Sequence, residues 1–116
     1  MQKSQTVLIV EDEAIIAIDL AEQLKELGFI PMLASSVVDA LLIVQSRDVD
    51  FAILDYEIGG ETSNEIAELL REKHVPFALC SGSDLGLAAH VFEGVPLIPK
   101  PYTEDHLRAA LQMAVN

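Results

Sequence analysis

The sequence is poor in positive charge. Seven Lys and Arg residues stand against nineteen Asp and Glu residues, which gives a formal net charge of −12 at pH 7. A chain with this balance repels polyanions, so we expect neither nucleic acid nor an anionic membrane surface as a direct partner. The DNA-binding and membrane-binding classes are therefore disfavoured.

Cysteine and long hydrophobic runs are also scarce. The single cysteine cannot form a disulfide within the chain, which favours a cytoplasmic location. The first apolar run, Val7 to Val10, is stopped by Glu11, Asp12 and Glu13 before it reaches the length of a signal-peptide core. No uninterrupted apolar run approaches the roughly 18 residues that suggest a membrane span.

What the chain does have is enough apolar residues for one core. Hydrophobic residues make up 51% of the 116 positions, which excludes a disordered acidic tail. A chain of this length fits one domain, so we expect a single domain over residues 1–116 with no room for an output module. A signal would then leave through a protein surface, as in a relay, a phosphate sink or a docking adaptor.

Short apolar runs alternate with amphipathic stretches of helical length, which predicts an α/β fold with a parallel sheet. The expected strands are Thr6 to Val10, Phe29 to Ala34, Phe51 to Leu54, Pro76 to Cys80 and Val95 to Ile98. The expected helices are Glu13 to Leu27, ended by Gly28; Ser36 to Ser46; Ser63 to Lys73; a weak one at Leu85 to Phe92; and one capped by Thr103 that reaches Val115.

The prolines predict the order of the strands. Proline cannot donate to a strand ladder, so within a sheet it is confined to edges, strand starts or bulges. Pro31 lies in the second expected strand, and Pro96 and Pro99 lie in or beside the fifth. These two strands should be the edges, which predicts the flavodoxin-like, doubly wound order 2-1-3-4-5.

Polar residues follow the carboxyl ends of four strands, where ligands bind in such sheets. They are Glu11 and Asp12 after the first strand, Asp55 after the third, Ser81 after the fourth and Lys100 after the fifth. Three clustered carboxylates repel one another unless a cation joins them, and Mg²⁺ suits such oxygen ligands. One carboxylate could then attack phosphorus, while Ser81 and Lys100 contact the phosphoryl oxygens.

The motifs around these residues resemble those of response regulator receiver domains, over essentially the whole chain. They read VLIVEDE at 7–13, FAILD at 51–55, LCSG at 79–82 and IPKPY at 98–102. The resemblance implies that Asp55 accepts phosphate from a histidine kinase or a phosphotransfer protein. It also implies that Asp12 and Asp55 ligate Mg²⁺, with Glu11 acting directly or through water and Glu57 through its backbone carbonyl. Such a domain catalyses only its own phosphorylation and dephosphorylation.

The sequence departs from the common receiver pattern at two places. Leu97 stands where receivers often have an aromatic switch residue, and Ile58-Gly59-Gly60-Glu61 replaces a Pro-Gly loop, so we expect a more flexible loop. With Pro76-Phe77 and Ser81-Gly82, these features resemble the receiver subfamily nicknamed FAT GUY, although Leu79-Cys80 replaces its usual Phe-Ala.

The first helix offers a candidate partner surface. Ile16, Leu20, Leu24 and Leu27 form its core stripe, whereas Ile15 and Ile18 fall outside the stripe. Since receivers present this helix to their kinase, we assign Ile15 and Ile18 to docking, with coverage by another part of the chain as the alternative. The expected fourth helix is nearly uncharged, which disfavours the charged dimer of transcription-factor receivers and favours a monomer with a downstream protein partner.

Three other functions remain open. A flavodoxin-like cofactor binder needs a phosphate cradle after the first strand, where Glu11, Asp12 and Glu13 would repel a flavin phosphate. A phosphohydrolase with an aspartyl intermediate often has a second acid where Glu57 stands, but no cap domain fits in this length. A pseudo-receiver that docks without phosphorylation is the third alternative.

Overall fold

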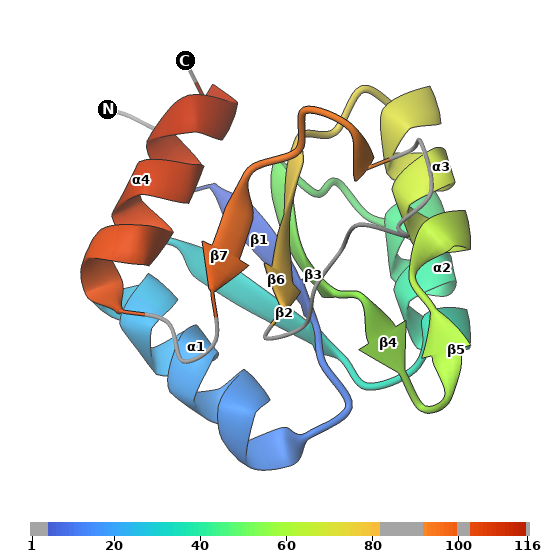
Figure 1. The fold of residues 1–116 in the computed structure, drawn as a ribbon, viewed down its shortest axis with the longest axis horizontal. Helices are drawn as coiled ribbons and strands as arrows, with labels where there is room; N and C mark the ends of the chain where they lie inside the picture. The colour runs from blue at the N-terminus through green and yellow to red at the C-terminus, as the bar shows by residue number, and fades with distance from the viewer. Residues whose placement is uncertain (1–4, 82–91, 100–102, 116) are drawn as a thin grey trace.

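The protein folds as a parallel sheet between two layers of helices (Figure 1). The computed structural model describes residues 5–81, 92–99 and 103–115, with side chains except at 81 and 113–115. The sheet strands are β1 (Thr6–Val10), β2 (Ile30–Ala34), β3 (Phe51–Asp55), β6 (Phe77–Ser81) and β7 (Leu97–Pro99). The helices in the described residues are α1 (Ala14–Glu26), α2 (Val37–Ser46), α3 (Asn64–Glu72) and α4 (Glu104–Val115).

The strand order confirms the prediction from the prolines. The sheet runs β2-β1-β3-β6-β7, with every neighbouring pair parallel. Pro31 lies in edge strand β2 and Pro99 in edge strand β7. Most predicted boundaries differ from the observed ones by one or two residues. The helix expected at Leu85 to Phe92 lies outside the described residues except for Phe92.

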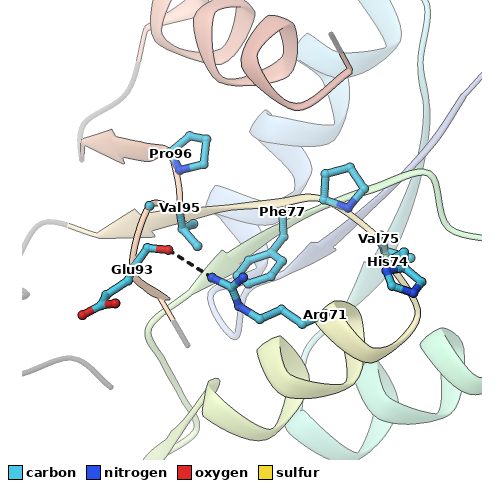
Figure 2. Close-up of a pocket in the computed structure, with 9 residues that line it drawn as sticks. Arg71, His74, Val75, Phe77, Glu93, Val95 and Pro96 are labelled. Atoms are coloured by element: carbon cyan, nitrogen blue, oxygen red, sulfur yellow. Dashed lines mark hydrogen bonds between the residues drawn. The ribbon is translucent and has the colours of Figure 1, made fainter. Parts of the chain in front are cut away.

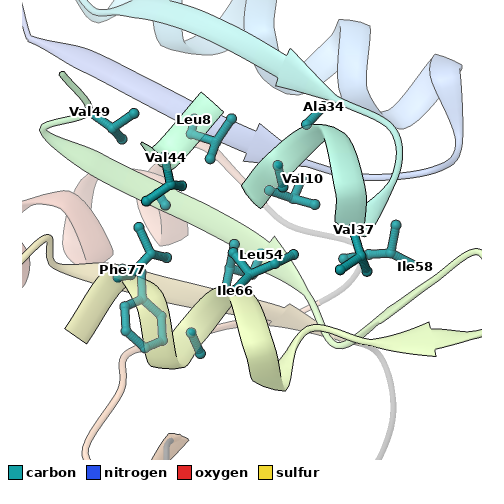
Figure 3. Packing of buried hydrophobic residues seen from close by; sticks show 14 of the residues in the cluster. Leu8, Val10, Ala34, Val37, Val44, Val49, Leu54, Ile58, Ile66 and Phe77 are labelled. Carbon is teal, nitrogen blue, oxygen red and sulfur yellow. The ribbon is translucent and has the colours of Figure 1, made fainter. Parts of the chain in front are cut away.

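Both faces of the inner strands β1, β3 and β6 are buried, which explains why these strands read as continuous apolar runs. In β1, Leu8 and Val10 pack into the core under α2 and α3, whereas Val7 and Ile9 pack into the core under α1 and α4. Figure 3 shows the first of these cores, where Val37 and Val44 of α2 meet side chains of the sheet. The sheet is therefore held on both sides, and its carboxyl edge is a rigid base for a site.

Local sequence signals set the helix ends as predicted. Gly28 has a φ of +94°, a conformation that favours glycine and ends α1. The Ser36 hydroxyl accepts a hydrogen bond from the Asp39 amide at 3.1 Å and caps α2. The Thr103 hydroxyl accepts one from the His106 amide at 3.2 Å before α4.

The segment after β3, which the sequence indicates as a loop, contains a short hairpin. Strand β4 (Glu57–Ile58) pairs antiparallel with β5 (Glu61–Thr62). The two residues between the strands, Gly59 and Gly60, have φ values of +58° and +83°. Positive φ at both central residues is the geometry of a tight type I′ hairpin turn, a conformation that favours glycine at both positions. The greater flexibility expected for this segment stays a prediction.

Candidate functional site

Three carboxylates meet at the carboxyl edge of the sheet, as the sequence predicted. One carboxylate oxygen from each of Glu11, Asp12 and Asp55 lies within 4.8 Å of the others. Glu11 is buried with 5% of its surface exposed, Asp55 is half-buried and Asp12 is exposed. The group therefore lies at the surface with one member inside, a position that a small ion or a phosphoryl group can reach.

Backbone hydrogen bonds hold the first two carboxylates in place. The backbone amide of Glu11 donates to the carbonyl of Ala34 on β2 at 3.1 Å. The side-chain Oε2 of Glu11 accepts a hydrogen bond from the Glu13 amide at 3.1 Å. Asp12 Oδ2 accepts from the Gly59 amide, in the hairpin, at 2.9 Å. These contacts fix both side chains next to the end of β3, where Asp55 is the last residue.

Of the other predicted site residues, the structure describes Glu57 and the backbone of Ser81. Within the described residues, Glu57 is not one of the three clustered carboxylates, and its side chain is exposed on β4. Ser81 ends β6, next to β3 and at the same edge of the sheet, while its side chain lies outside the described residues. Lys100 lies outside them altogether, although the preceding Pro99 pairs with Ser81.

The chemistry of the three carboxylates fits a hard divalent cation. Three anionic groups so close together repel one another, and a cation that they share removes the repulsion. All the ligand atoms are oxygen, which Mg²⁺ prefers, and Mg²⁺ commonly takes one or two carboxylates together with water and phosphate oxygens. The residues present therefore suit Mg²⁺.

A cavity of about 610 Å³ lies away from this group, beside the amino ends of β6 and β7 (Figure 2). Its lining is mixed, with the polar residues Arg71, His74 and Glu93 among apolar ones. Arg71 lies over the Phe77 ring at 5.6 Å and donates to the Glu93 carbonyl at 3.1 Å. The cavity contains none of the predicted site residues. We therefore place the functional site at the carboxyl edge.

The predicted docking residues are exposed. Ile15 and Ile18 of α1 have 85% and 55% of their surface exposed, so no described part of the chain covers them. On the opposite side of the helix, Leu20 and Leu24 are buried as predicted, whereas Ile16 and Leu27 are half-buried. Leu97, at the position of the missing aromatic residue, is 61% exposed.

Sequence reasoning missed one residue of the site, Gly59, because its contribution is a backbone amide. The residue that it contacts, Asp12, is 47 positions away in the chain. A signal was present, since Gly-Gly is one of the residue pairs favoured at the centre of a type I′ turn. The turn could thus have been predicted, but its contact with Asp12 depends on the tertiary fold.

Comparisons with known proteins agree on one family. The family model "Response regulator receiver domain" matches residues 7–112. The transcriptional regulatory protein PdtaR of Mycobacterium tuberculosis is 31% identical over 115 residues, covering 95% of this chain and 56% of the relative. A putative NtrX-like response regulator of Rickettsia felis is 30% identical, covering 93% of this chain and 24% of the relative. The chain thus spans about half or less of these relatives.

Solved structures match over nearly the full chain. The solution structure of SdrG from Sphingomonas melonis Fr1 is 34% identical, with a TM-score of 0.87 and all of both chains covered. A CheY-like receiver domain from Methylobacillus flagellatus is 28% identical, with a TM-score of 0.84 and coverage of 97% of this chain and 99% of that one.

None of the helices within the described residues has the length and apolar character that a membrane span requires.

Proposed function

Because the chain belongs to the response regulator receiver domain family, we propose that it accepts a phosphoryl group on Asp55 and passes on a signal through protein contacts. The observation that carries this proposal is the group formed by Glu11, Asp12 and Asp55, with carboxylate oxygens within 4.8 Å of one another at the carboxyl edge of the sheet. Of the three, Asp55 ends the central strand β3 and is half-buried, so it is both held firmly and accessible.

The transfer is a displacement at phosphorus. A carboxylate oxygen of Asp55 forms a bond to the phosphorus of a phosphohistidine on a histidine kinase or phosphotransfer protein. The bond from phosphorus to the histidine nitrogen breaks, and that nitrogen keeps the electron pair and takes up a proton. The product is an aspartyl phosphate, which water later hydrolyses. The chain catalyses these two reactions only on itself.

Glu11, Asp12 and Asp55 would hold Mg²⁺, together with the backbone carbonyl of Glu57. When bound, Mg²⁺ neutralises charge on the transferred phosphoryl group and on the carboxylates. In this proposal the Ser81 hydroxyl donates a hydrogen bond to one phosphoryl oxygen and the Lys100 ammonium pairs with another. Glu11 would contribute its carboxylate from a buried position, since only 5% of its surface is exposed.

The partners in this proposal are proteins. Ile15 and Ile18 of α1 form the docking patch for the histidine kinase or phosphotransfer protein, since they are large, apolar and exposed beside the acidic group. A further protein reads the phosphorylated state. We propose that the chain acts as a monomer in the cytoplasm, without direct contact with nucleic acid or membrane. Membership of the FAT GUY subfamily stays a prediction.

Beryllofluoride, which mimics a phosphoryl group on a carboxylate, tests the proposal without a partner. With Mg²⁺ present, the wild-type chain should bind one beryllofluoride, seen as a bound ¹⁹F resonance and as shifts of the amides near residue 55. Asp55→Asn should show neither, because the amide lacks the anionic oxygen that attacks beryllium. Removal of Mg²⁺ with EDTA should abolish the signal in the wild type.

The matched control measures whether Asp55→Asn folds as the wild type does. Asp55→Asn removes one of three clustered negative charges, so its melting temperature should equal or exceed that of the wild type. Binding of beryllofluoride to Asp55→Asn, or its failure to bind to a folded wild-type chain with Mg²⁺, would contradict the proposal.

A further inference from the structure

The cavity beside the amino ends of β6 and β7 lies at the edge of the sheet opposite to the acidic group (Figure 2). Its volume of about 610 Å³ is within the range of about 300–1,000 Å³ that small-ligand sites have. The basic side chains of Arg71 and His74 line it together with half-buried valines and prolines, which are Val75, Pro76, Val95 and Pro96. It therefore offers a ligand both a positive charge and apolar contact.

The cavity forms where the ladder between β6 and β7 ends. The first paired residues are Leu79 and Leu97, and the Leu79 amide donates to the Pro96 carbonyl at 2.9 Å. Because backbone groups alternate in direction along a strand, the N–H and carbonyl of Phe77 point to the same side as those of Leu79. Pairing of the Phe77 carbonyl would need an N–H at position 96, but proline has none. The polar backbone groups of Phe77 are thus left beside the cavity, without a ladder partner in the described part of β7.

Arg71 is held in place on the cavity wall. Its guanidinium carbon lies 5.6 Å from the centre of the Phe77 ring, and its Nη2 donates to the Glu93 carbonyl at 3.1 Å. The Phe77 ring is buried and packs edge-on against Phe92, with 6.4 Å between the ring centres. Figure 2 shows the Glu93 carboxylate directed away from the guanidinium. A cation that is already positioned loses little freedom when it binds an anion, which favours binding.

His74 occupies a backbone position that favours glycine. It follows α3 with a φ of +60°, and every other described residue with a positive φ is a glycine. Helix α1 ends with the same hydrogen-bond spacing, and the corresponding residue there is Gly28. Any side chain in this conformation is less stable than glycine. The imidazole therefore lies at the cavity at a cost in stability, which contact with a ligand would offset.

We propose that this cavity binds a small organic carboxylate with an apolar body. The carboxylate pairs with the Arg71 guanidinium, and the apolar body lies against the valines and prolines of the lining. His74, which Figure 2 places at the end of the cavity away from Glu93, contacts the far end of the ligand. The cavity contains none of the clustered carboxylates, so this inference does not depend on the proposed phosphorylation.

The probe is sodium 4-phenylbutyrate, which combines a carboxylate with an apolar body. It is titrated into the full-length protein, and binding is followed through backbone amide resonances. Shifts should appear at Phe77, Gly94 and Val95, with a dissociation constant on the order of 1 mM for a ligand of this size. 4-Phenylbutanamide has the same body without the charge, so it should bind at least about tenfold more weakly.

Arg71→Gln removes the charge that selects the carboxylate. The dissociation constant of 4-phenylbutyrate should rise about tenfold, and the preference for the acid over the amide should disappear. Arg108→Gln is the matched control, because it removes the same charge from an exposed ion pair with Glu104 on α4. This control should bind both compounds as the wild type does.

His74→Gly separates contact with a ligand from a structural role. Glycine suits the observed φ of +60°, so the melting temperature should rise by a few degrees. The dissociation constant of 4-phenylbutyrate should rise about threefold, because the contact with the imidazole is lost. A histidine with a purely structural role would give a lower melting temperature or unchanged binding.

The titrations have three contrary outcomes. Absence of shifts at Phe77, Gly94 and Val95 in the folded wild type would overturn the inference. Equal binding of the acid and the amide by the wild type would overturn the preference for a carboxylate. Unchanged binding of 4-phenylbutyrate by Arg71→Gln would remove Arg71 from the site and contradict the inference as well. Each of these results would leave the proposed phosphorylation of Asp55 untouched.

Discussion

The double substitution Ile15→Asp with Ile18→Asp is expected to abolish phosphoryl transfer from a phosphohistidine protein, with a loss of at least about a hundredfold. That corresponds to about 2.7 kcal/mol of binding and orientation, within the range found for central interface residues. Both side chains are more than half exposed on α1, and burying them against a partner removes apolar surface from water. Aspartates there would keep that surface hydrated and add charge to an acidic chain.

Labelling by a small donor distinguishes docking from damage. Acetyl phosphate needs no docking surface, so its reaction with the double variant should stay within about twofold of the wild type. The transfer assay compares initial rates from any phosphohistidine protein that phosphorylates the wild-type chain. Loss of both reactions would mean that the substitutions harm the fold, and retention of both would remove Ile15 and Ile18 from the partner surface.

A matched control lies on another helix. Val38 and Leu42 of α2 are 62% and 57% exposed, so they form an apolar pair of similar exposure elsewhere on the molecule. Val38→Asp with Leu42→Asp should leave transfer from the phosphohistidine protein near the wild-type rate. An equal loss in this control would show a general effect of added negative charge, with no docking site on α1.

Leu54→Ala is expected to lower the free energy of unfolding by about 3 kcal/mol, the middle of the range for a buried leucine. Leu54 is fully buried on the central strand β3, between Val10 of β1 and Leu79 of β6, and it packs into the core under α2 and α3. The substitution removes three carbon atoms and leaves a cavity that neighbours on a rigid sheet cannot close. Urea unfolding followed by circular dichroism measures the change.

Leu42→Ala provides the matched comparison for this prediction. The chemical change is the same, but Leu42 is 57% exposed on a helix, where alanine is the better helix former. Its expected effect is below about 0.5 kcal/mol. A loss for Leu54→Ala as small as that for Leu42→Ala would contradict the packing of β3 described above.

The sheet could be predicted from the sequence because its signals are local. Prolines such as Pro31 and Pro99 mark edge strands through the missing N–H, and continuous apolar runs mark strands buried on both faces. The caps at Ser36 and Thr103 and the stop at Gly28 also depend on neighbouring residues only. Exact boundaries do not follow from the sequence, because the ends of a strand depend on which partner amides and carbonyls lie opposite.

The acidic group could be predicted because topology brings strand ends together. Once β1 and β3 are neighbours in a parallel sheet, the residues after Val10 and Leu54 must meet at one edge. The hydrogen bond from Gly59 to Asp12 could not be predicted in this way. It depends on the turn of a short hairpin and on how Ile58 anchors that hairpin in the core, and both are tertiary effects.

The difference between local signals and tertiary packing also explains which residues of α1 are exposed. Helical periodicity placed Ile15 and Ile18 away from the core stripe, and the structure confirms their exposure. Periodicity also placed Ile16 and Leu27 in the core, but each is only half-buried. The alanines Ala17 and Ala21 are buried instead, which lets α1 pack closely against the sheet.

The most direct test of the central claim is to map the phosphorylated residue. The wild-type chain is treated with acetyl phosphate, with Mg²⁺ or with EDTA, and then with borohydride, which reduces an aspartyl phosphate to homoserine. Tandem mass spectrometry should find homoserine at position 55 in the Mg²⁺ sample and none in the EDTA sample. Modification at Asp12 or at a histidine in place of Asp55, or equal modification without Mg²⁺, would contradict the account.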